Sequence, residues 1–282
     1  EEVWDIVARE KVNALSIVGD AMAVPLLDAL EASEGRWDLS SVFSVGSGGA
    51  VFSESKQEAF KRHFPNVFIN NSFGSSESGN MGMDGGGKKG QGLGNVTKSE
   101  FMSVISDVDG EPNAHVAPGE MGIFARSGHI PVGYYNDPEK TAKTIVQVDG
   151  KPWLLLGDEA RLEEDNSITV YGRGSNCINS GGEKIFPEEV EQALKANPAI
   201  FDCLVVATPD ERFGSKVTAV VAVRGDSDIS LEKVQADARQ HIAGYKVPRE
   251  LHVVDEVPRA PSGKPAYPKA LEIVLAGNHK VA

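Results

Sequence analysis

Three short segments combine small residues with groups that could act on a bound ligand. Residues 46–49 and 74–79 are rich in Gly and Ser, and each segment follows an apolar run that is typical of a strand. Residues 258–264 place Lys264 in a loop of proline, serine and glycine. Small residues let a ligand approach the backbone, and a lysine in such a loop can bring a positive charge to a group that becomes negative during a reaction. The sequence therefore predicts two ligand-binding turns and one mobile cation.

Other motifs of known chemistry are present only in part. Residues 82–88 fit G-x-x-x-x-G-K, but Lys89 stands where a phosphate-binding loop needs Ser or Thr for Mg²⁺, and no apolar strand precedes the motif. We therefore interpret residues 80–94 as a mobile surface loop. The six histidines show no metal-ligand spacing, and the sequence contains no G-x-S-x-G elbow of a serine hydrolase.

Composition excludes several classes of protein. The 282 residues include 28 Lys and Arg and 41 Asp and Glu, so the formal net charge is −13 and the isoelectric point is near 5.0. Such an acidic chain is not expected to bind nucleic acid or an anionic membrane surface. No apolar run approaches the ~20 residues of a transmembrane helix. Two cysteines, Cys177 and Cys203, fit a reducing cytoplasm, and the length suggests two domains.

The spacing of apolar residues predicts the elements that hold these turns. Over residues 1–70, helix-like and strand-like segments alternate, which indicates a parallel α/β sheet. Ligands of such sheets bind beyond the carboxyl ends of the strands, where both turns are expected. The predicted helices cover residues 1–11, 21–30, 53–63 (with Ser53 as its cap), 187–197 and 231–243. The predicted strands cover residues 14–18, 41–45, 67–70, 103–105, 122–125, 167–171, 202–208, 216–223 and 250–254.

The predicted fold class is α/β: a partial parallel α/β sheet subdomain and a small β subdomain, followed by a C-terminal α+β domain. We place the first domain at residues 1–172, with its α/β part ending at about residue 94 and its β-rich part covering 95–172. The second domain covers residues 173–282. The glycines around Arg173 mark the expected junction.

Separated segments resemble, in order, the signature motifs of adenylate-forming enzymes, the superfamily of acyl-CoA synthetases, firefly luciferase and peptide-synthetase adenylation domains. The segments are Ser47-Gly48-Gly49-Ala50, residues 71–77 (N-S-F-G-S-S-E), Gly119-Glu120 with Gly128 and Gly133-Tyr134-Tyr135, residues 153–158 (W-L-L-L-G-D), residues 172–191 from Gly-Arg to P-E-E-V-E, and residues 258–264 (P-R-A-P-S-G-K). Their order along essentially the whole chain makes chance a poor explanation.

The resemblance implies ATP or AMP, Mg²⁺ and CoA as ligands. The residues that it assigns to cofactor binding are Gly48, Gly49, Ala50, Asn71, Ser72, Phe73, Gly74, Ser75, Ser76, Asp158, Arg173, Gly181, Gly182 and Lys264. Phe73 would lay its ring on the adenine, although ordinary core packing also explains this residue. Asn71 or a neighbour would bind the adenine amine, and the Gly181-Gly182 pair would let the pantetheine arm of CoA pass beside the backbone.

The same resemblance implies three catalytic residues, Ser76, Glu77 and Lys264. Ser76 would donate to the α-phosphate, Glu77 would bind Mg²⁺, and Lys264 would neutralise charge on the phosphate and the attacking carboxylate. Asp158 would accept the ribose hydroxyls, although a turn aspartate after glycine is an alternative reading, and Arg173 would reach the ribose or a phosphate. The smaller domain would then rotate, so that Lys264 leaves and Gly181-Gly182 arrives.

Two departures and one missing segment qualify the resemblance. Ser175 stands where the superfamily usually has Asp or Lys at its hinge, and Leu156 stands where Thr is usual. The superfamily's Ser/Thr/Gly-rich phosphate loop, which precedes these motifs, is not found. We therefore expect the C-terminal part of a protein about twice as long, and we expect that this part alone cannot complete adenylation.

The implied activity of the parent protein is ATP-dependent acyl-CoA ligation through an acyl-adenylate, in the cytoplasm. Residues 15–21 and the turn after residue 45 look most like actinobacterial ligases for fatty acids or sterol side-chain acids. The expected partners are that acid, CoA and the missing N-terminal part, while the oligomeric state, including a homodimer, is left open. One alternative is an adenylation domain that loads a carrier-protein thiol. Another is a non-catalytic module that binds a nucleotide or acyl group.

Overall fold

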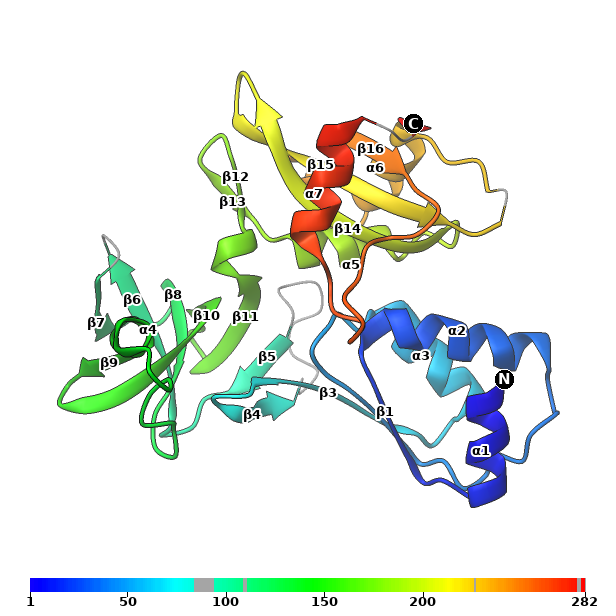
Figure 1. Cartoon of the computed structure of the whole chain (residues 1–282), viewed down its shortest axis with the longest axis horizontal. Helices are drawn as coiled ribbons and strands as arrows, with labels where there is room; N and C mark the ends of the chain where they lie inside the picture. Colours follow the sequence, from blue (N-terminus) through cyan, green and yellow to red (C-terminus); the bar gives the residue numbers. More distant parts are fainter. Residues whose placement is uncertain (84–93, 109–110, 226, 278–279, 282) are drawn as a thin grey trace. The chain divides into compact units, whose positions relative to one another are not determined.

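The computed structural model describes residues 1–83, 94–108, 111–225, 227–277 and 280–281 (Figure 1). The predicted surface loop at 80–94 therefore lies largely outside the described residues. The chain divides into two units, of which the first comprises Glu1–Asn71 with Ile178–Ala282 and the second comprises Ser72–Cys177. The predicted domain boundary falls at the end of a strand that covers Ser167–Arg173, and it stays a prediction.

The N-terminal part of the first unit is a parallel sheet with three helices. Strands β1 (Ala14–Ile17), β2 (Ser44–Ser47) and the first half of β3 (Phe68–Ser75) pair in parallel. Helices α1 (Glu2–Glu10), α2 (Gly19–Ala32) and α3 (Glu54–His63) pack their apolar faces onto one core. Trp4, Val45 and Phe60 are fully buried in it. The predicted parallel α/β sheet is confirmed.

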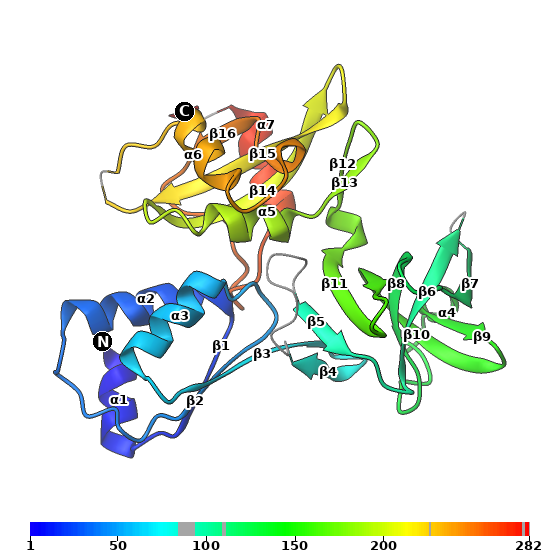
Figure 2. The same ribbon diagram turned by 180° about the vertical axis from the view of Figure 1, so that it is seen from behind.

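The C-terminal part of the first unit is a sheet covered on both faces. Strands β14 (Ile200–Asp210) and β15 (Gly214–Val223) form a long antiparallel hairpin, β16 (Glu250–Val253) joins in parallel, and β17 (Lys280–Val281) closes the sheet. Cys203 and Val205 face a core with α5 (Pro187–Leu194) and α6 (Leu231–Ala238), whereas Leu204 and Val206 face α7 (Tyr267–Ala276). This alternation follows from the two-residue period of a strand. Accordingly, α7 is in front of the hairpin in Figure 1 and α6 is in front in Figure 2.

The second unit is built on a seven-stranded sheet. The order is β5 (Gly94–Thr97), β11 (Ser167–Arg173), β10 (Lys151–Leu162), β8 (Met121–Arg126), β6 (Met102–Val108) and β7 (Glu111–His115), with β9 (Ile145–Val148) also on β10. The second half of β3 pairs with β4 (Gly79–Met83). Helix α4 (Pro138–Thr144) begins at Asp137, whose carboxylate caps the Lys140 N–H. The predicted small β subdomain is confirmed.

Two short elements join the larger ones. A 3-10 turn, η1 (Gly174–Asn176), follows β11 and contains the expected hinge residue Ser175. Strands β12 (Ile178–Ser180) and β13 (Glu183–Ile185) form a tight hairpin through Gly181-Gly182, and a second 3-10 turn, η2 (Gly244–Lys246), precedes β16. None of the helices in the described part of the chain has the length and apolar character needed to cross a membrane.

Several local predictions are wrong. The expected turn at 74–79 begins only after Ser75, because β3 continues to that residue. Ser53 does stand at the N-terminus of α3, but its hydroxyl makes no capping bond and lies 3.2 Å from the hydroxyl of Ser55. The helices expected at 187–197 and 231–243 end at Leu194 and Ala238. Helix α7 was not predicted.

Candidate functional site

The turn after β2 and the loop that carries Lys264 lie together in the first unit. Gly49 adopts a φ of +82°, a conformation that favours glycine, and a Cβ placed on it would lie 3.4 Å from Cε of Lys264. The end of the lysine side chain therefore lies close to Gly49. The two segments that sequence analysis singled out independently are neighbours.

The loop that carries Lys264 is ordered by its own backbone. Ala260 N–H donates to the carbonyl of Lys264 at 2.9 Å, and Gly263 N–H donates to Ala260 at 2.8 Å. Ala266 N–H also donates to Pro258 at 3.2 Å. These bonds close a small hairpin, while the expected mobility of the loop stays a prediction. The Lys264 side chain itself is exposed.

Asn71 and its neighbour Asn70 end the half of β3 that belongs to the first unit. Asn71 pairs in register with Ser47, and Asn70 pairs with Gly46. The side-chain oxygen of Asn70 is buried, and it has no hydrogen-bond partner among the described residues. A buried oxygen without a partner is costly, so a donor such as an amine would stabilise this position.

Residues 75–78 form a turn in the second unit that leaves Ser76 exposed. The Ser75 hydroxyl accepts from the N–H groups of Glu77 and Ser78 at 3.2 and 3.1 Å, and Ser75 N–H donates to the Ser78 hydroxyl at 3.0 Å. Ser75 is therefore occupied with holding the turn. Gly74 is needed just before it, since a Cβ there would lie 2.1 Å from the carbonyl oxygen of Gly79.

Glu77 is held by a tyrosine. The Tyr134 hydroxyl donates to Oε1 of Glu77 at 2.9 Å. This bond, together with the backbone N–H of Glu77, lowers the pKa of the carboxyl group below its ordinary value. Burial and the same bond raise the pKa of Tyr134. The ammonium group of Lys140 lies 3.8 Å from the centre of the Tyr134 ring, so a cation stands behind the pair.

Asp158 and Arg173 form the second charged pair of this unit. Nε of Arg173 lies 3.1 Å from Oδ1 of Asp158, and Nη1 donates to the carbonyl of Leu156 at 2.7 Å. Burial raises the pKa of Asp158, although the arginine opposes that shift. Gly157 lets the guanidinium approach, because its φ is +77° and a Cβ there would lie 3.2 Å from Nη1. Asp158 lies within strand β10, which excludes the alternative reading of a simple turn residue.

Several of these side chains line one cavity of about 400 Å³. Its lining combines the polar side chains of Ser75, Glu77, Tyr134 and Arg173 with the apolar residues 154–156 of β10. Lys140 and Lys143 of α4 add positive charge to this lining. A cavity of this size with few converging polar groups is typical of a small-molecule site.

Phe73 and Ser72 lie in the part of β3 that belongs to the second unit. The Phe73 ring lies 5.4 Å from that of Phe124, centre to centre, and packs against the core of this unit. Both readings of Phe73 therefore keep support, since the ring is also partly exposed. Ser72 pairs in register with Met83 of β4.

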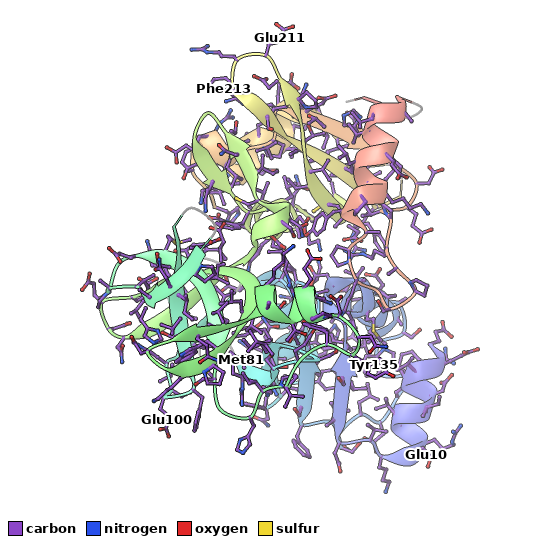
Figure 3. All side chains as sticks on the ribbon, turned by 60° about the vertical axis from the view of Figure 1, so that its left-hand side comes forward. Glu10, Met81, Glu100, Tyr135, Glu211 and Phe213 are labelled. Carbon is purple, nitrogen blue, oxygen red and sulfur yellow. The ribbon has the colours of Figure 1, made fainter. Side chains whose placement is uncertain are left out.

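Gly181 and Gly182 lie in the tight turn between β12 and β13 of the first unit. Both have a positive φ, 63° and 89°. Gly181 N–H donates to the carbonyl of Phe213 at 2.9 Å, and a Cβ on Gly181 would lie 2.9 Å from the Phe213 ring. Figure 3 shows Phe213 and Glu211 at the tip of the β14–β15 hairpin. Gly182 has open space around it.

The contacts of Tyr134 and Lys140 near Glu77 were not predicted. Tyr134 was part of a quoted motif, Gly133-Tyr134-Tyr135, but no role was assigned to it. Its role follows from the hydrogen bond of its hydroxyl to Glu77. Residues 77 and 134 are far apart in the sequence, and their spacing does not predict this contact. Lys140 is visible in the sequence only as one of several lysines on a predicted surface.

The residues around Glu77 fit a magnesium ion. Among the residues that the structure describes, no group of three or more His, Cys, Asp and Glu side chains could hold a metal, so Glu77 would be a single carboxylate ligand. That arrangement suits Mg²⁺, which keeps several waters and shares its remaining positions with substrate phosphates. The Tyr134 hydroxyl donates to Oε1, and this hydrogen bond orients the carboxylate that would bind such an ion.

Comparison with known proteins places the chain in a group. Residues 189–264 match the AMP-binding enzyme C-terminal domain. The chain is 47% identical over 272 residues to a 3-oxocholest-4-en-26-oate–CoA ligase of Rhodococcus rhodochrous. The matched region covers 94% of this chain and 49% of that protein. The chain is also 47% identical over 280 residues to a medium/long-chain-fatty-acid–CoA/3-oxocholest-4-en-26-oate–CoA ligase of Mycolicibacterium smegmatis, covering 97% and 50%.

A solved structure agrees in fold. The anthranilate CoA ligase AuaEII, in complex with anthranoyl-AMP, superimposes with a TM-score of 0.79 at 22% identity, covering 98% of this chain and 52% of that one. This structure shows the fold, and the match to the AMP-binding enzyme C-terminal domain together with the two CoA ligases confirms the resemblance drawn from the motifs. It spans about half the length of the curated relatives it matches.

Proposed function

We propose that the complete protein is an AMP-forming acyl-CoA ligase, which converts a carboxylic acid, ATP and CoA into acyl-CoA, AMP and pyrophosphate. The closeness of the Lys264 side chain to Gly49 supports this proposal most directly. A lysine lies beside a turn of small residues, where the backbone and the ammonium group can face one phosphate together. The substrate class is a fatty acid or a sterol side-chain acid, as named for the relatives.

The first half-reaction makes the acyl-adenylate. The substrate carboxylate attacks the α-phosphorus of ATP, and pyrophosphate leaves with the electron pair of the broken P–O bond. The protein needs to align the two reactants and to offset negative charge rather than to form covalent bonds. We assign charge stabilisation to Lys264 and Ser76, adenine and ribose binding to Phe73, Asp158 and Arg173, and a magnesium ligand to Glu77. Bound Mg²⁺ would offset charge on the phosphate oxygens.

The second half-reaction transfers the acyl group to a thiol. The sulfur of CoA attacks the acyl carbon, the bond between that carbon and the phosphate oxygen breaks, and AMP leaves with its electron pair while the thiol proton passes to solvent. We assign the backbone of Gly181-Gly182 to the pantetheine arm, since Gly182 has open space beside it. Lys264 has no part in this step, which gives the proposal a clear test.

Replacing Lys264 by alanine tests the assignment in the complete polypeptide. Adenylate formation should fall by about 10²–10³-fold, the usual cost of one lost group that stabilises developing charge. Thioester formation from supplied acyl-adenylate should be retained. Lys269→Ala, an exposed lysine at the start of α7, is the matched control and should change neither rate. Both rates are measured by ATP–pyrophosphate exchange and by acyl-CoA release.

The acceptor assay separates the alternatives. Labelling of a carrier protein in place of CoA consumption would identify an adenylation domain. Binding of AMP or acyl-adenylate in a calorimeter, with no turnover by the complete polypeptide, would identify a non-catalytic binding module. Equal loss of both half-reactions in Lys264→Ala would contradict the role given to this lysine.

A further inference from the structure

We propose that Asp20 and Arg259 are positioning residues for Lys264, and that they act through a buried chain of charges joining the start of α2 to the Lys264 loop. The proposal rests on the proposed function, because it assigns the chain to the adenylate-forming step. All its members belong to the first unit. In Figures 1 and 2 the segment that precedes α7 reaches the N-terminal end of α2.

Arg259 binds the Lys264 loop through its guanidinium group. Its Nε and Nη2 donate to the two carboxylate oxygens of Asp202, each at 2.7 Å, and its Nη1 donates to the carbonyl of Gly263 at 3.0 Å. The guanidinium thus connects strand β14 to the residue directly before Lys264. A planar fork that makes three bonds at once fixes the orientation of this loop in a way that an ammonium group could not.

Lys195 extends the chain toward α2. Its ammonium group lies 3.3 Å from Oδ1 of Asp202 and 3.6 Å from Oδ2 of Asp20, and its side chain is only 4% exposed. Burial alone would lower the pKa of this lysine, but the carboxylates around it, Asp20 first among them, raise it instead. Lys195 is therefore a buried cation shared between two aspartates from segments that are distant in sequence.

Asp20 connects this cation to Val51 and Ser53, which directly follow the turn at residues 48–50. Its backbone N–H donates to the carbonyl of Val51 at 2.9 Å, and its Oδ1 accepts from Ser53 N–H at 2.9 Å. The other oxygen, Oδ2, faces Lys195 and has no hydrogen-bond partner among the described residues. Because the Lys264 side chain lies beside Gly49, the chain of contacts closes on itself.

The chain of charges favours one arrangement of the two segments. If α5 and the Lys264 loop moved away from α2 together, Asp20 and Lys195 would be separated, and a buried charge without its partner is strongly unfavourable. A second ion pair joins α2 to the residue after β15: Nη1 of Arg224 donates to the two carboxylate oxygens of Asp28 at 3.0 and 3.1 Å. Its side chains are 32% and 40% exposed, so it contributes little. The chain therefore offers its own matched control.

The test compares Asp20→Asn with Asp28→Asn in the complete polypeptide. Asparagine keeps the size of Asp20 and an acceptor for Ser53 N–H but removes the charge that faces Lys195. Adenylate formation in Asp20→Asn should fall about tenfold or more, in the range that truncating a buried charge pair produces. Thioester formation from supplied acyl-adenylate should stay within twofold of the unaltered protein. Asp28→Asn should leave both rates within twofold.

Arg259→Lys is the second variant. It keeps the charge beside Asp202 but loses the fork, so adenylate formation should again fall while thioester formation persists. Retention of the second rate shows that the variant is folded. Equal loss of both rates in Asp20→Asn and Arg259→Lys, or unchanged adenylate formation in both, overturns the positioning role. If the unaltered protein itself makes no adenylate, the proposed function fails instead.

Discussion

Two carboxylates of the second unit show how a local partner decides the charge of a side chain. At Glu77, the Tyr134 hydroxyl donates a hydrogen bond to the carboxylate and lowers its pKa, so this bond outweighs burial. At Asp158, burial outweighs the neighbouring Arg173 and the pKa rises. The two acids therefore differ: the lowered pKa of Glu77 suits a cation ligand, while Asp158 is a more buried carboxyl group whose pKa is raised.

Replacing Tyr134 by phenylalanine tests the first of these causes. The variant loses the hydrogen bond to Glu77 but keeps the ring, so the pKa of Glu77 should rise toward its ordinary value. The measurement is an NMR titration of the Glu77 side-chain carboxyl carbon. Tyr135→Phe is the matched control, because Tyr135 is 95% exposed. An unchanged Glu77 pKa in Tyr134→Phe, or an equal rise in both variants, would show that the tyrosine is not the cause.

At the scale of single residues, the sequence predicted which side chains matter better than it predicted their contacts. Lys264 and Gly49, chosen from separate motifs, are neighbours in the structure. In contrast, Ser75 was predicted to bind the nucleotide, but its hydroxyl accepts a hydrogen bond within the turn. Tyr134 was not recognised as the partner of Glu77. Motif position carries chemical identity, whereas a hydrogen bond depends on tertiary packing that the spacing of residues does not contain.

Among the helices and strands, those with a regular apolar pattern could be predicted and those with irregular geometry could not. The parallel strands and helices of residues 1–70 could be predicted because their apolar residues repeat regularly. The turn expected at 74–79 failed because β3 crosses into the second unit and continues to Ser75. Strand β10 was not predicted because bulges around Glu159 and the positive φ of Gly157 break its two-residue alternation. The bulges and the Gly157 conformation beside Asp158 are therefore the reason why the strand that contains this residue could not be predicted.

The turn between β12 and β13 offers a prediction at this scale. Gly181 and Gly182 both have a positive φ, so alanine should cost each position a similar backbone strain of about 1–2 kcal/mol. Only a Cβ on Gly181 meets Phe213, at 2.9 Å. Gly181→Ala should therefore lose about 1 kcal/mol more than Gly182→Ala, as expected for mild overpacking. Urea unfolding of the two variants measures the difference, and equal midpoints would show that Phe213 moves away freely.

At the scale of the whole molecule, a buried group of charges holds segments that no local pattern connects. Asp20 lies near the start of the chain, and Lys195, Asp202 and Arg259 lie in its C-terminal part. The sequence marks each as an ordinary charged residue, and an acidic chain of net charge −13 gives no reason to bury any of them. Such contacts could not be predicted, because a pattern along the chain does not show which distant charges meet.

Glu191 of α5 lies in the same buried group and gives the stability of the protein a dependence on pH. Burial raises its pKa from 4.5 to about 7, although Lys195, the Val205 N–H, Arg259 and Tyr267 oppose the shift. The folded protein therefore keeps a proton that the unfolded chain releases above its ordinary pKa. This group stabilises the fold most at low pH, and the contribution is lost as pH rises from about 4.5 to about 7.

Glu191→Gln should remove this dependence. Glutamine keeps an acceptor for the Val205 N–H, which Glu191 binds at 3.0 Å, but it cannot ionise. Relative to the unaltered protein, the variant should gain unfolding free energy between pH 5 and pH 8, by at most on the order of 3 kcal/mol. Urea unfolding at the two pH values measures it. Glu232→Gln, an exposed residue in the first turn of α6, is the control and should show no such gain. A variant whose stability changes with pH just as the unaltered protein does would mean that Glu191 is charged in the folded state at neutral pH, and that the buried group contains three carboxylates for its two cations.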